Sequence, residues 1–201
     1  GEAELLGDTK VSVNGESYVG KDLIIATGSS PVIPPIPGAD KPHVLTSTRM
    51  LEIQKIPKQL VVVGGGVIGV EFASMFSQVG TQVSVIEMLD EILPMMDADI
   101  SKQMRRAMKQ VSFKTGCTVR QITDSEVIYT DSKGKEQRQA ADVVLMSVGR
   151  RPNSAGCEGI GLAMERGAIQ VDEYMRTSIA HVYAVGDVNG RSLLAHSASR
   201  M

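Results

Sequence analysis

The fold is decided by residues 60–87, which read LVVVGGGVIGVEFASMFSQVGTQVSVIE. Residues 60–63 are a continuous apolar run of the kind that a parallel sheet buries on both faces. The apolar residues after the glycines recur on one face of an expected α-helix: Ile68, Phe72, Met75, Phe76 and Val79. Gly80 stands where a helix C-terminal glycine belongs, and residues 82–86 form a second strand. This order predicts a strand–helix–strand unit of a parallel α/β sheet.

The turn between the first strand and the helix reads GGGVIG and consists of Gly64, Gly65, Gly66, Val67, Ile68 and Gly69. It fits the pattern G-x-G-x-x-G, and its place between a buried strand and an amphipathic helix makes the match specific. Gly64 permits the tight turn, Gly66 lets the backbone approach a pyrophosphate, and Gly69 allows close helix–strand packing. The helix N-terminus adds free N–H groups and a positive dipole end. The motif therefore predicts a dinucleotide-binding Rossmann unit.

Two acidic residues qualify this prediction. Glu87 ends the second strand eighteen residues after Gly69, close to the spacing of about 20 residues at which a carboxylate binds the adenosine ribose. A 2′-phosphate would be repelled there, and Met88 and Leu89 offer no arginine to hold one, so NAD is favoured over NADP. Glu71 lies one turn into the helix, and the sequence alone leaves open whether it is a solvent-facing charge or a functional group.

Composition excludes several function classes. The 201 residues are 42% hydrophobic and 22% charged with a formal net charge of -2, which indicates a globular α/β protein without a nucleic-acid partner. No apolar run approaches the roughly 20 residues that a membrane helix needs. Cys117 and Cys157 lie too far apart for a redox pair, and the three histidines lack metal-ligand spacing, so no metal site is predicted.

The rest of the chain predicts further strands and one more helix. Strands are expected at residues 10–13, 17–20, 22–27, 142–148, 168–171 and 182–185, and a small antiparallel β-meander at residues 118–122, 126–130 and 136–138. A helix capped by Asp97 would carry Ile100, Met104, Met108 and Val111 on one face. Residues 29–42 hold five of the eight prolines, which favours a linker. We expect three parts: residues 1–47, the C-terminal part of an FAD-binding domain and a linker; residues 48–150, an NAD-binding Rossmann domain; and residues 151–201, a return to the first domain.

Six segments together resemble one enzyme family. They are LIIATGSSP at 23–31, VVVGGGVIGVEFAS at 61–74, VIEMLDEILPMMDADISK at 85–102, VLMSVGRRPN at 144–153, VYAVGDV at 182–188 and LLAHSAS at 193–199. Their order resembles the dihydrolipoyl dehydrogenases, which are flavin-dependent pyridine nucleotide–disulfide oxidoreductases. Residues 193–196 look like the lipoyl enzymes rather than the glutathione or mercuric reductases. The segment from Met108 to Cys117 looks shorter than the family's usual form.

The resemblance implies two sets of cofactor-binding residues. NAD would contact Gly64, Gly65, Gly66, Val67, Ile68, Gly69, Val70, Glu71, Glu87, Val119 and Gly149. FAD would contact Gly1, Thr27, Gly28, Ser29, Asp187, Leu193, Leu194, Ala195 and His196. Glu71 would face the nicotinamide and flavin and pair with a lysine that this chain lacks. The family's redox cysteines would precede residue 1 and its dimerisation domain, with the catalytic histidine, would follow residue 201, so no catalytic residue is assigned here.

The implied activity is oxidation of protein-bound dihydrolipoamide, with electrons passing through FAD to NAD. The implied partners are a lipoyl-bearing protein of a 2-oxoacid dehydrogenase or glycine cleavage complex and a second copy in a homodimer. The bacterial style of the chain favours the cytoplasm, or the mitochondrial matrix for a eukaryotic source. Two alternatives remain open: another FAD-dependent enzyme of this superfamily, such as an NADH peroxidase or oxidase or a coenzyme A disulfide reductase, and a nucleotide-binding module without turnover.

Overall fold

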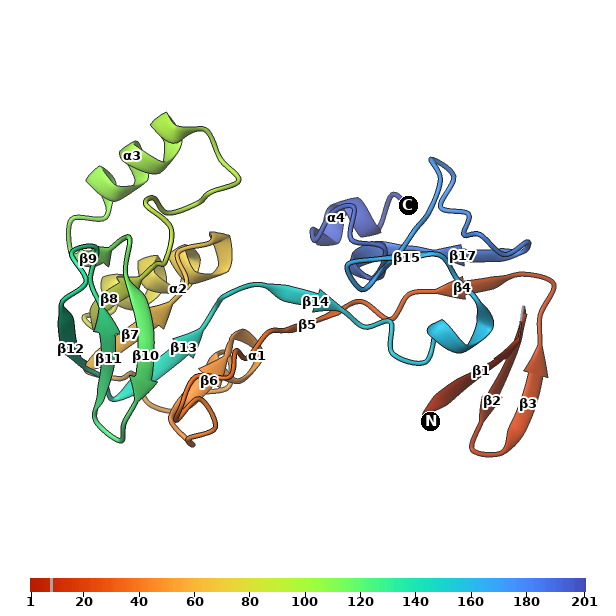
Figure 1. Cartoon of the computed structure of the whole chain (residues 1–201), viewed down its shortest axis with the longest axis horizontal. Helices are drawn as coiled ribbons and strands as arrows, with labels where there is room; N and C mark the ends of the chain where they lie inside the picture. Colours follow the sequence, from red (N-terminus) through yellow and green to blue (C-terminus); the bar gives the residue numbers. More distant parts are fainter. Residues whose placement is uncertain (8) are drawn as a thin grey trace. The chain divides into compact units, whose positions relative to one another are not determined.

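The computed structural model describes residues 1–7 and 9–201, and the chain forms two compact units (Figure 1). Unit 1 comprises Gly1–Ser30 and Arg150–Met201, and unit 2 comprises Pro31–Gly149. The proline-rich residues 31–42, which the sequence analysis grouped with the first domain, thus belong to the compact unit 2. No helix among the described residues has the length and apolar character that crossing a membrane requires.

A five-stranded parallel sheet forms the centre of unit 2. Its spatial order is β6 (Val44–Thr46), β13 (Val143–Met146), β7 (Gln59–Val63), β8 (Gln82–Ile86) and β9 (Val111–Lys114). The strands predicted at residues 60–63, 82–86 and 142–148 are therefore confirmed. Because β7 connects to β8 on one side and pairs with the much later β13 on the other, the strand order reverses beside β7.

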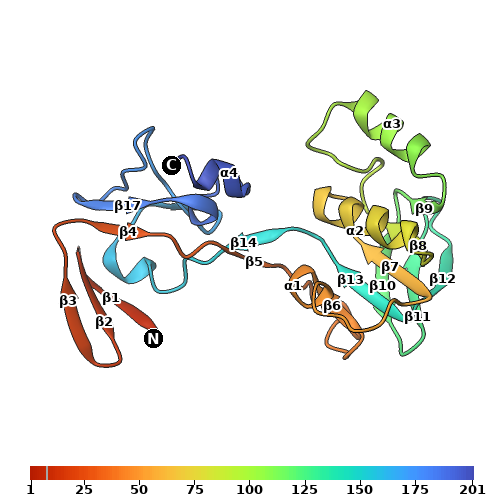
Figure 2. The ribbon, with the colours of Figure 1, turned by 180° about the vertical axis from the view of Figure 1, so that it is seen from behind.

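The two faces of this sheet pack against different layers. Leu60 and Val62 of β7 pack in one cluster with helix α2 (Val67–Gln78), which lies against β7 and β8 (Figure 2). Val61 and Val63 pack in a second cluster with the antiparallel meander of β10 (Thr118–Ile122), β11 (Glu126–Thr130) and β12 (Glu136–Ala140). Alternate residues of β7 thus enter opposite cores, which explains the continuous apolar run in its sequence.

The predicted apolar face of α2 is partly wrong. Phe72 and Phe76 are buried, but Met75 and Val79 are 47% and 52% exposed. The buried face instead includes Val70 and Ala73, because the helix packs flat on the sheet through a narrow stripe and its flanks stay in solvent. Gly80 follows the helix with a φ of 93°, the left-handed conformation expected of a residue after a helix C-terminus.

The second predicted helix is shorter than the apolar spacing from Ile100 to Val111 indicated. Helix α3 (Ala98–Ala107) begins after Asp97 as expected, although the Asp97 side chain makes no capping hydrogen bond. Ile100 and Met104 are exposed, and only Ser101 is buried within the helix. Val111 was wrongly placed on this helix, since it begins β9 and pairs in parallel with Val83 of β8. Four apolar residues at helical spacing cannot show where a helix ends and a parallel edge strand begins.

Unit 1 contains several small sheets around one apolar cluster. β1 (Ala3–Gly7), β2 (Lys10–Val13) and β3 (Glu16–Val19) form an antiparallel sheet, and β1 was not predicted. Asn14 and Gly15 both have positive φ, as a two-residue hairpin turn requires. β4 (Leu23–Ile25) pairs in parallel with β17 (Val182–Ala184). The apolar cluster is formed by Ile25, Cys157, Leu162, Ile169, Val182, Ala184 and Val188.

Short elements complete both units. In unit 1, β15 (Met164–Glu165) and β16 (Ala168–Ile169) form a hairpin, so the strand predicted at residues 168–171 is only two residues long. A 3-10 turn, η1 (Glu158–Ile160), precedes it, and η2 (Gly186–Asn189) and helix α4 (Ala195–Ala198) follow β17. Helix α1 (Ser47–Met50) belongs to unit 2. β5 (Ser29–Pro31) and β14 (Arg150–Pro152) pair where the chain leaves and re-enters unit 1.

Candidate nucleotide-binding and flavin-binding sites

The candidate dinucleotide site lies at one edge of the unit 2 sheet. Parallel strands end at the same edge, and the register pairs Val63 of β7 with Ile86 of β8 and Met146 of β13. Gly64, Glu87 and the residues after β13 therefore meet there. This is also the place where the strand order reverses, and open α/β sheets bind their ligands in the crevice at such a point.

The three glycines of the motif are required for different reasons. A Cβ at Gly64 would lie 2.3 Å from the carbonyl oxygen of Ser147, and the φ of Gly64 is +105°. A Cβ at Gly69 would lie 2.2 Å from the carbonyl oxygen of Gly64. A Cβ at Gly66 would meet nothing within 4 Å, and its φ of -72° suits any residue. Close contacts with backbone oxygens thus explain Gly64 and Gly69 but not Gly66.

Free backbone donors surround Gly66. Gly66 is the N-cap residue of the twelve-residue helix α2 and has no side chain to cap it. The first backbone bond of the helix runs from the N–H of Val70 to the carbonyl of Gly66. The N–H groups of Val67, Ile68 and Gly69 consequently have no partner within the helix. An open position without a Cβ, next to unpaired N–H groups at a positive helix end, fits the pyrophosphate of a dinucleotide.

Glu87 is buried beside this turn, with 8% of its surface exposed. One carboxylate oxygen accepts a hydrogen bond from the N–H of Gly65 at 2.5 Å, and the other accepts one from the N–H of Leu89 at 2.7 Å. Each carboxylate oxygen can accept a second bond. Glu87 can therefore hold the glycine-rich turn and still accept hydrogen bonds from two ribose hydroxyls, a structural contribution that the sequence analysis did not foresee.

The loop after β8 secures the same turn from the other side. The N–H of Leu93 donates to the carbonyl of Gly65 at 2.8 Å, so both backbone polar groups of Gly65 are engaged by residues 87–93. Leu93 is buried and adopts a φ of 52°, a conformation that costs a residue with a Cβ on the order of 1 kcal/mol. Arg105 of α3 pairs with Glu91 of this loop at 3.1 Å. The turn is thus held by contacts from the protein's own residues.

The other residues predicted to contact NAD occupy different environments. Val67 is exposed at the helix start, whereas Val70 is buried against the sheet. Glu71 is exposed and makes no hydrogen bond or ion pair with a described residue. Val119 is buried in the cluster between the sheet and the meander, and Gly149 has a φ of +118° just beyond β13. Their contact with NAD remains a prediction.

The candidate flavin site in unit 1 is built on the parallel pair β4 and β17. Ile25 pairs with Ala184, which places the residues after both strands side by side. Ser29 donates its hydroxyl hydrogen to Oδ2 of Asp187 at 2.5 Å. Gly28 has a φ of +70° with open space around it, and Thr27 is exposed. The fold thus joins two predicted flavin residues that lie 158 positions apart in the chain.

Two residues of this site were missed by the sequence analysis. Asn153 donates its side-chain amide to the carbonyl of Thr27 at 3.0 Å and accepts a hydrogen bond from the Ser30 hydroxyl at 2.8 Å. Arg150 donates two hydrogen bonds to Ser29, one to its hydroxyl and one to its carbonyl. Both lie in the motif VLMSVGRRPN, which carried the family resemblance but received no site role beyond Gly149.

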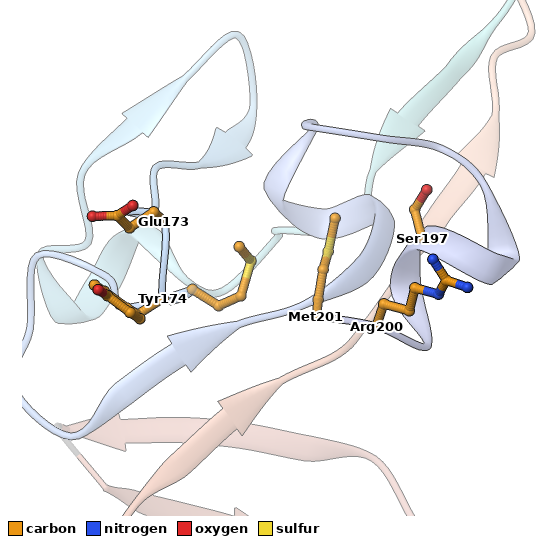
Figure 3. A pocket seen from close by; sticks show the side chains of 6 residues that line it. Glu173, Tyr174, Ser197, Arg200 and Met201 are labelled. Carbon is orange, nitrogen blue, oxygen red and sulfur yellow. The ribbon is translucent and has the colours of Figure 1, made fainter.

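The remaining predicted flavin residues lie at the two ends of the chain. Leu193, Leu194, Ala195 and His196 are exposed around the start of α4, and Gly1 is exposed near Val13. A cavity of about 510 Å³ lies between the α4 region, with Ser197, Arg200 and Met201, and the loop that carries Glu173 and Tyr174 (Figure 3). The sulfur of Met201 accepts a hydrogen bond from the N–H of Gly186, the neighbour of Asp187.

Comparison with known proteins places this architecture in a family. The family model described as pyridine nucleotide-disulphide oxidoreductase matches residues 1–201. The chain belongs to this family. FAD and NAD are the cofactors on which the family depends, so the predicted cofactors are confirmed, as is the Rossmann-like α/β fold with its antiparallel meander.

Individual relatives support the same conclusion. A dihydrolipoyl dehydrogenase of Acholeplasma laidlawii is 46% identical to this chain, over 98% of the chain and 60% of the relative. A dihydrolipoyl dehydrogenase of Bacillus subtilis is 39% identical over 92% of the chain and 42% of the relative. A mercuric reductase of Staphylococcus aureus is 35% identical over 94% of the chain and 36% of the relative.

The solved structure of the HOCl-induced flavoprotein disulfide reductase RclA from Escherichia coli superimposes with a TM-score of 0.88 and 33% identity. The match covers 98% of this chain and 47% of that protein. The chain thus spans roughly half of this structure and 60% of the Acholeplasma relative.

Proposed function

We propose that this chain is the NAD-binding central portion of a flavin-dependent dihydrolipoyl dehydrogenase, together with the part of the FAD site that follows β4 and β17. The observation that carries the nucleotide assignment is the open space beside Gly66 at the N-terminus of α2. Apart from the neighbouring residues in the chain, no atom of the described residues lies within 4 Å of a Cβ built at position 66, and no described side chain caps the N–H groups of the helix that begins there. A bound pyrophosphate supplies a reason for a glycine at this position that the protein alone does not.

Glu87 supports NAD rather than NADP. Its carboxylate is buried and already bonded to the N–H groups of Gly65 and Leu89, so it cannot swing away from a bound ribose without breaking the turn. A 2′-phosphate would face this fixed negative charge. Arg105, a cation of α3 beside the following loop, already has a carboxylate partner in Glu91.

FAD, when bound, supplies the two-electron chemistry that links oxidation of a dithiol to reduction of NAD. The chain's own residues bind and orient: the turn around Gly66 holds the nucleotide, and Asp187 with Ser29 lines the flavin. The resemblance to the dihydrolipoyl dehydrogenases implies that Glu71 faces the nicotinamide, and we propose this role for its exposed carboxylate, which lies one turn into α2. No catalytic residue is assigned within the chain.

The choice of protein-bound dihydrolipoamide as substrate rests on the 46% and 39% identical relatives, which are both dihydrolipoyl dehydrogenases. Residues 193–196 also resemble the lipoyl enzymes. The proposed partners are accordingly a lipoyl-bearing protein of a 2-oxoacid dehydrogenase or glycine cleavage complex and a second copy of the enzyme. The proposed compartment is the cytoplasm.

The deciding experiment is steady-state NAD reduction by dihydrolipoamide in the full-length flavoprotein. NADH formation that depends on dihydrolipoamide is the expected result. Reduction of peroxide or coenzyme A disulfide by NADH, without activity toward dihydrolipoamide, would replace the proposal with another enzyme of the family. Nucleotide binding without turnover of any of these substrates would leave only a binding module.

A further inference from the structure

Arg150, the first residue of β14, donates two hydrogen bonds from its guanidinium to Ser29 of the candidate flavin site. Its Nε donates to the hydroxyl oxygen of Ser29 at 2.7 Å, and its Nη2 donates to the carbonyl oxygen of Ser29 at 2.6 Å. Nε also lies 3.9 Å from Oδ2 of Asp187. The side chains of Arg150 and Asp187 are only 25% and 22% exposed, so solvent screens this cluster less than a surface pair.

The direction of these hydrogen bonds follows from the chemistry of the three groups. A guanidinium has donors and no acceptor, and a serine hydroxyl carries a single hydrogen. Because Arg150 donates to the oxygen of Ser29, the Ser29 hydrogen is directed to Oδ2 of Asp187. The other oxygen of Asp187, Oδ1, has no hydrogen-bond partner in the part of the chain that the structure describes. We call this chain of hydrogen bonds, from Arg150 through the Ser29 hydroxyl to Asp187, the relay. The relay fixes Oδ2 of Asp187 and leaves Oδ1 available.

We propose that Arg150 is a positioning residue for the flavin, acting through Ser29 to hold Asp187 with Oδ1 presented to the cofactor. This inference rests on the proposed flavin site and adds a residue to which the sequence assigned no role. Arg150 lies 121 positions from Ser29 in the chain. It acts on the cofactor through Ser29 and Asp187 rather than by touching it.

The two hydrogen bonds of Arg150 allow its positioning role to be separated from a merely structural one. The bond from Nη2 to the Ser29 carbonyl joins the side chain of Arg150 to the backbone of β5 and is independent of the Ser29 side chain. Ser29→Ala removes the side-chain hydrogen bonds but keeps this bond to the Ser29 carbonyl. Arg150→Lys keeps the charge but lacks the planar fork that serves both acceptors. Arg151 is exposed, makes no hydrogen bond or ion pair with a described residue, and provides the matched control Arg151→Lys.

The test is FAD affinity of the full-length apoenzyme, measured by flavin fluorescence titration, with thermal melting of each variant in parallel. We expect Ser29→Ala and Arg150→Lys each to weaken FAD binding about tenfold, because each removes a hydrogen bond in which one partner is charged. Because the two residues act in one relay, the double variant should also lose about tenfold rather than a hundredfold. Arg151→Lys should match the wild type.

Each other outcome has a definite meaning. A hundredfold loss in the double variant, or wild-type affinity in both single variants, would overturn the relay while leaving the flavin site intact. If Arg150→Lys lowers the melting temperature, the Ser29→Ala result decides, because that variant keeps the hydrogen bond from Arg150 Nη2 to the Ser29 carbonyl. A wild-type full-length protein that fails to bind FAD would overturn the proposed flavin site itself and this inference with it.

Discussion

Replacing Gly66 by valine distinguishes a phosphate cradle from an ordinary turn. Position 66 has φ and ψ of -72° and -179°, which any residue adopts, and a Cβ there would meet nothing within 4 Å. The folding cost is therefore limited to the preference for glycine over valine at a helix N-cap, about 1 kcal/mol. The two added methyl groups would occupy the space proposed for the pyrophosphate, and we expect NADH binding to weaken by at least about tenfold, or about 1.4 kcal/mol.

The assay is a fluorescence titration with NADH on the purified protein, paired with thermal melting. Gly159→Val is the matched control, because position 159 also lacks a positive φ and has open space around it. Gly69→Ala gives the opposite contrast, since its Cβ would lie 2.2 Å from the Gly64 carbonyl and should destabilise the fold by about 1–3 kcal/mol. Unchanged NADH affinity per folded Gly66→Val molecule would refute the cradle.

Three further predictions follow from individual contacts. NADPH should bind at least about tenfold more weakly than NADH because of Glu87; equal affinities in the same titration would contradict the NAD assignment. The isolated 201-residue chain should purify colourless, since residues 27–29 and Asp187 supply only part of the flavin contacts, and stoichiometric FAD in its absorbance spectrum would show otherwise. The hydrogen bond and charge of Lys41 lower the pKa of Asp124 from its ordinary value of 3.8. This pair should therefore stabilise the fold above about pH 4 and lose its effect as the pH falls through the lowered pKa. Urea unfolding should show Lys41→Met less stable than wild type at pH 7 and equal to it at strongly acidic pH; a difference that persists in acid would count against the pairing.

The local elements of unit 2 could be predicted from the sequence because their signals are contained in short stretches. The run at residues 60–63, the glycines that follow it and residues 82–86 each specify backbone conformation through neighbours a few positions away. The same holds for the meander, where turn residues separate strands of alternating pattern. These elements, and with them the family, were determined by sequence alone.

Only the tertiary structure decided which residues share a site and where some elements end. Val111 belongs to a strand because β8 offers it a parallel partner, which no helical periodicity can reveal. Glu87 supports the turn at Gly65, and Arg150 reaches Ser29 across 121 positions. Such contacts depend on the order and register of strands that are distant in the chain, and a single sequence carries no local signal for them. The sequence thus predicts which residue types bind the cofactors. The hydrogen bonds that orient these residues form only when distant strands pair in the folded sheets.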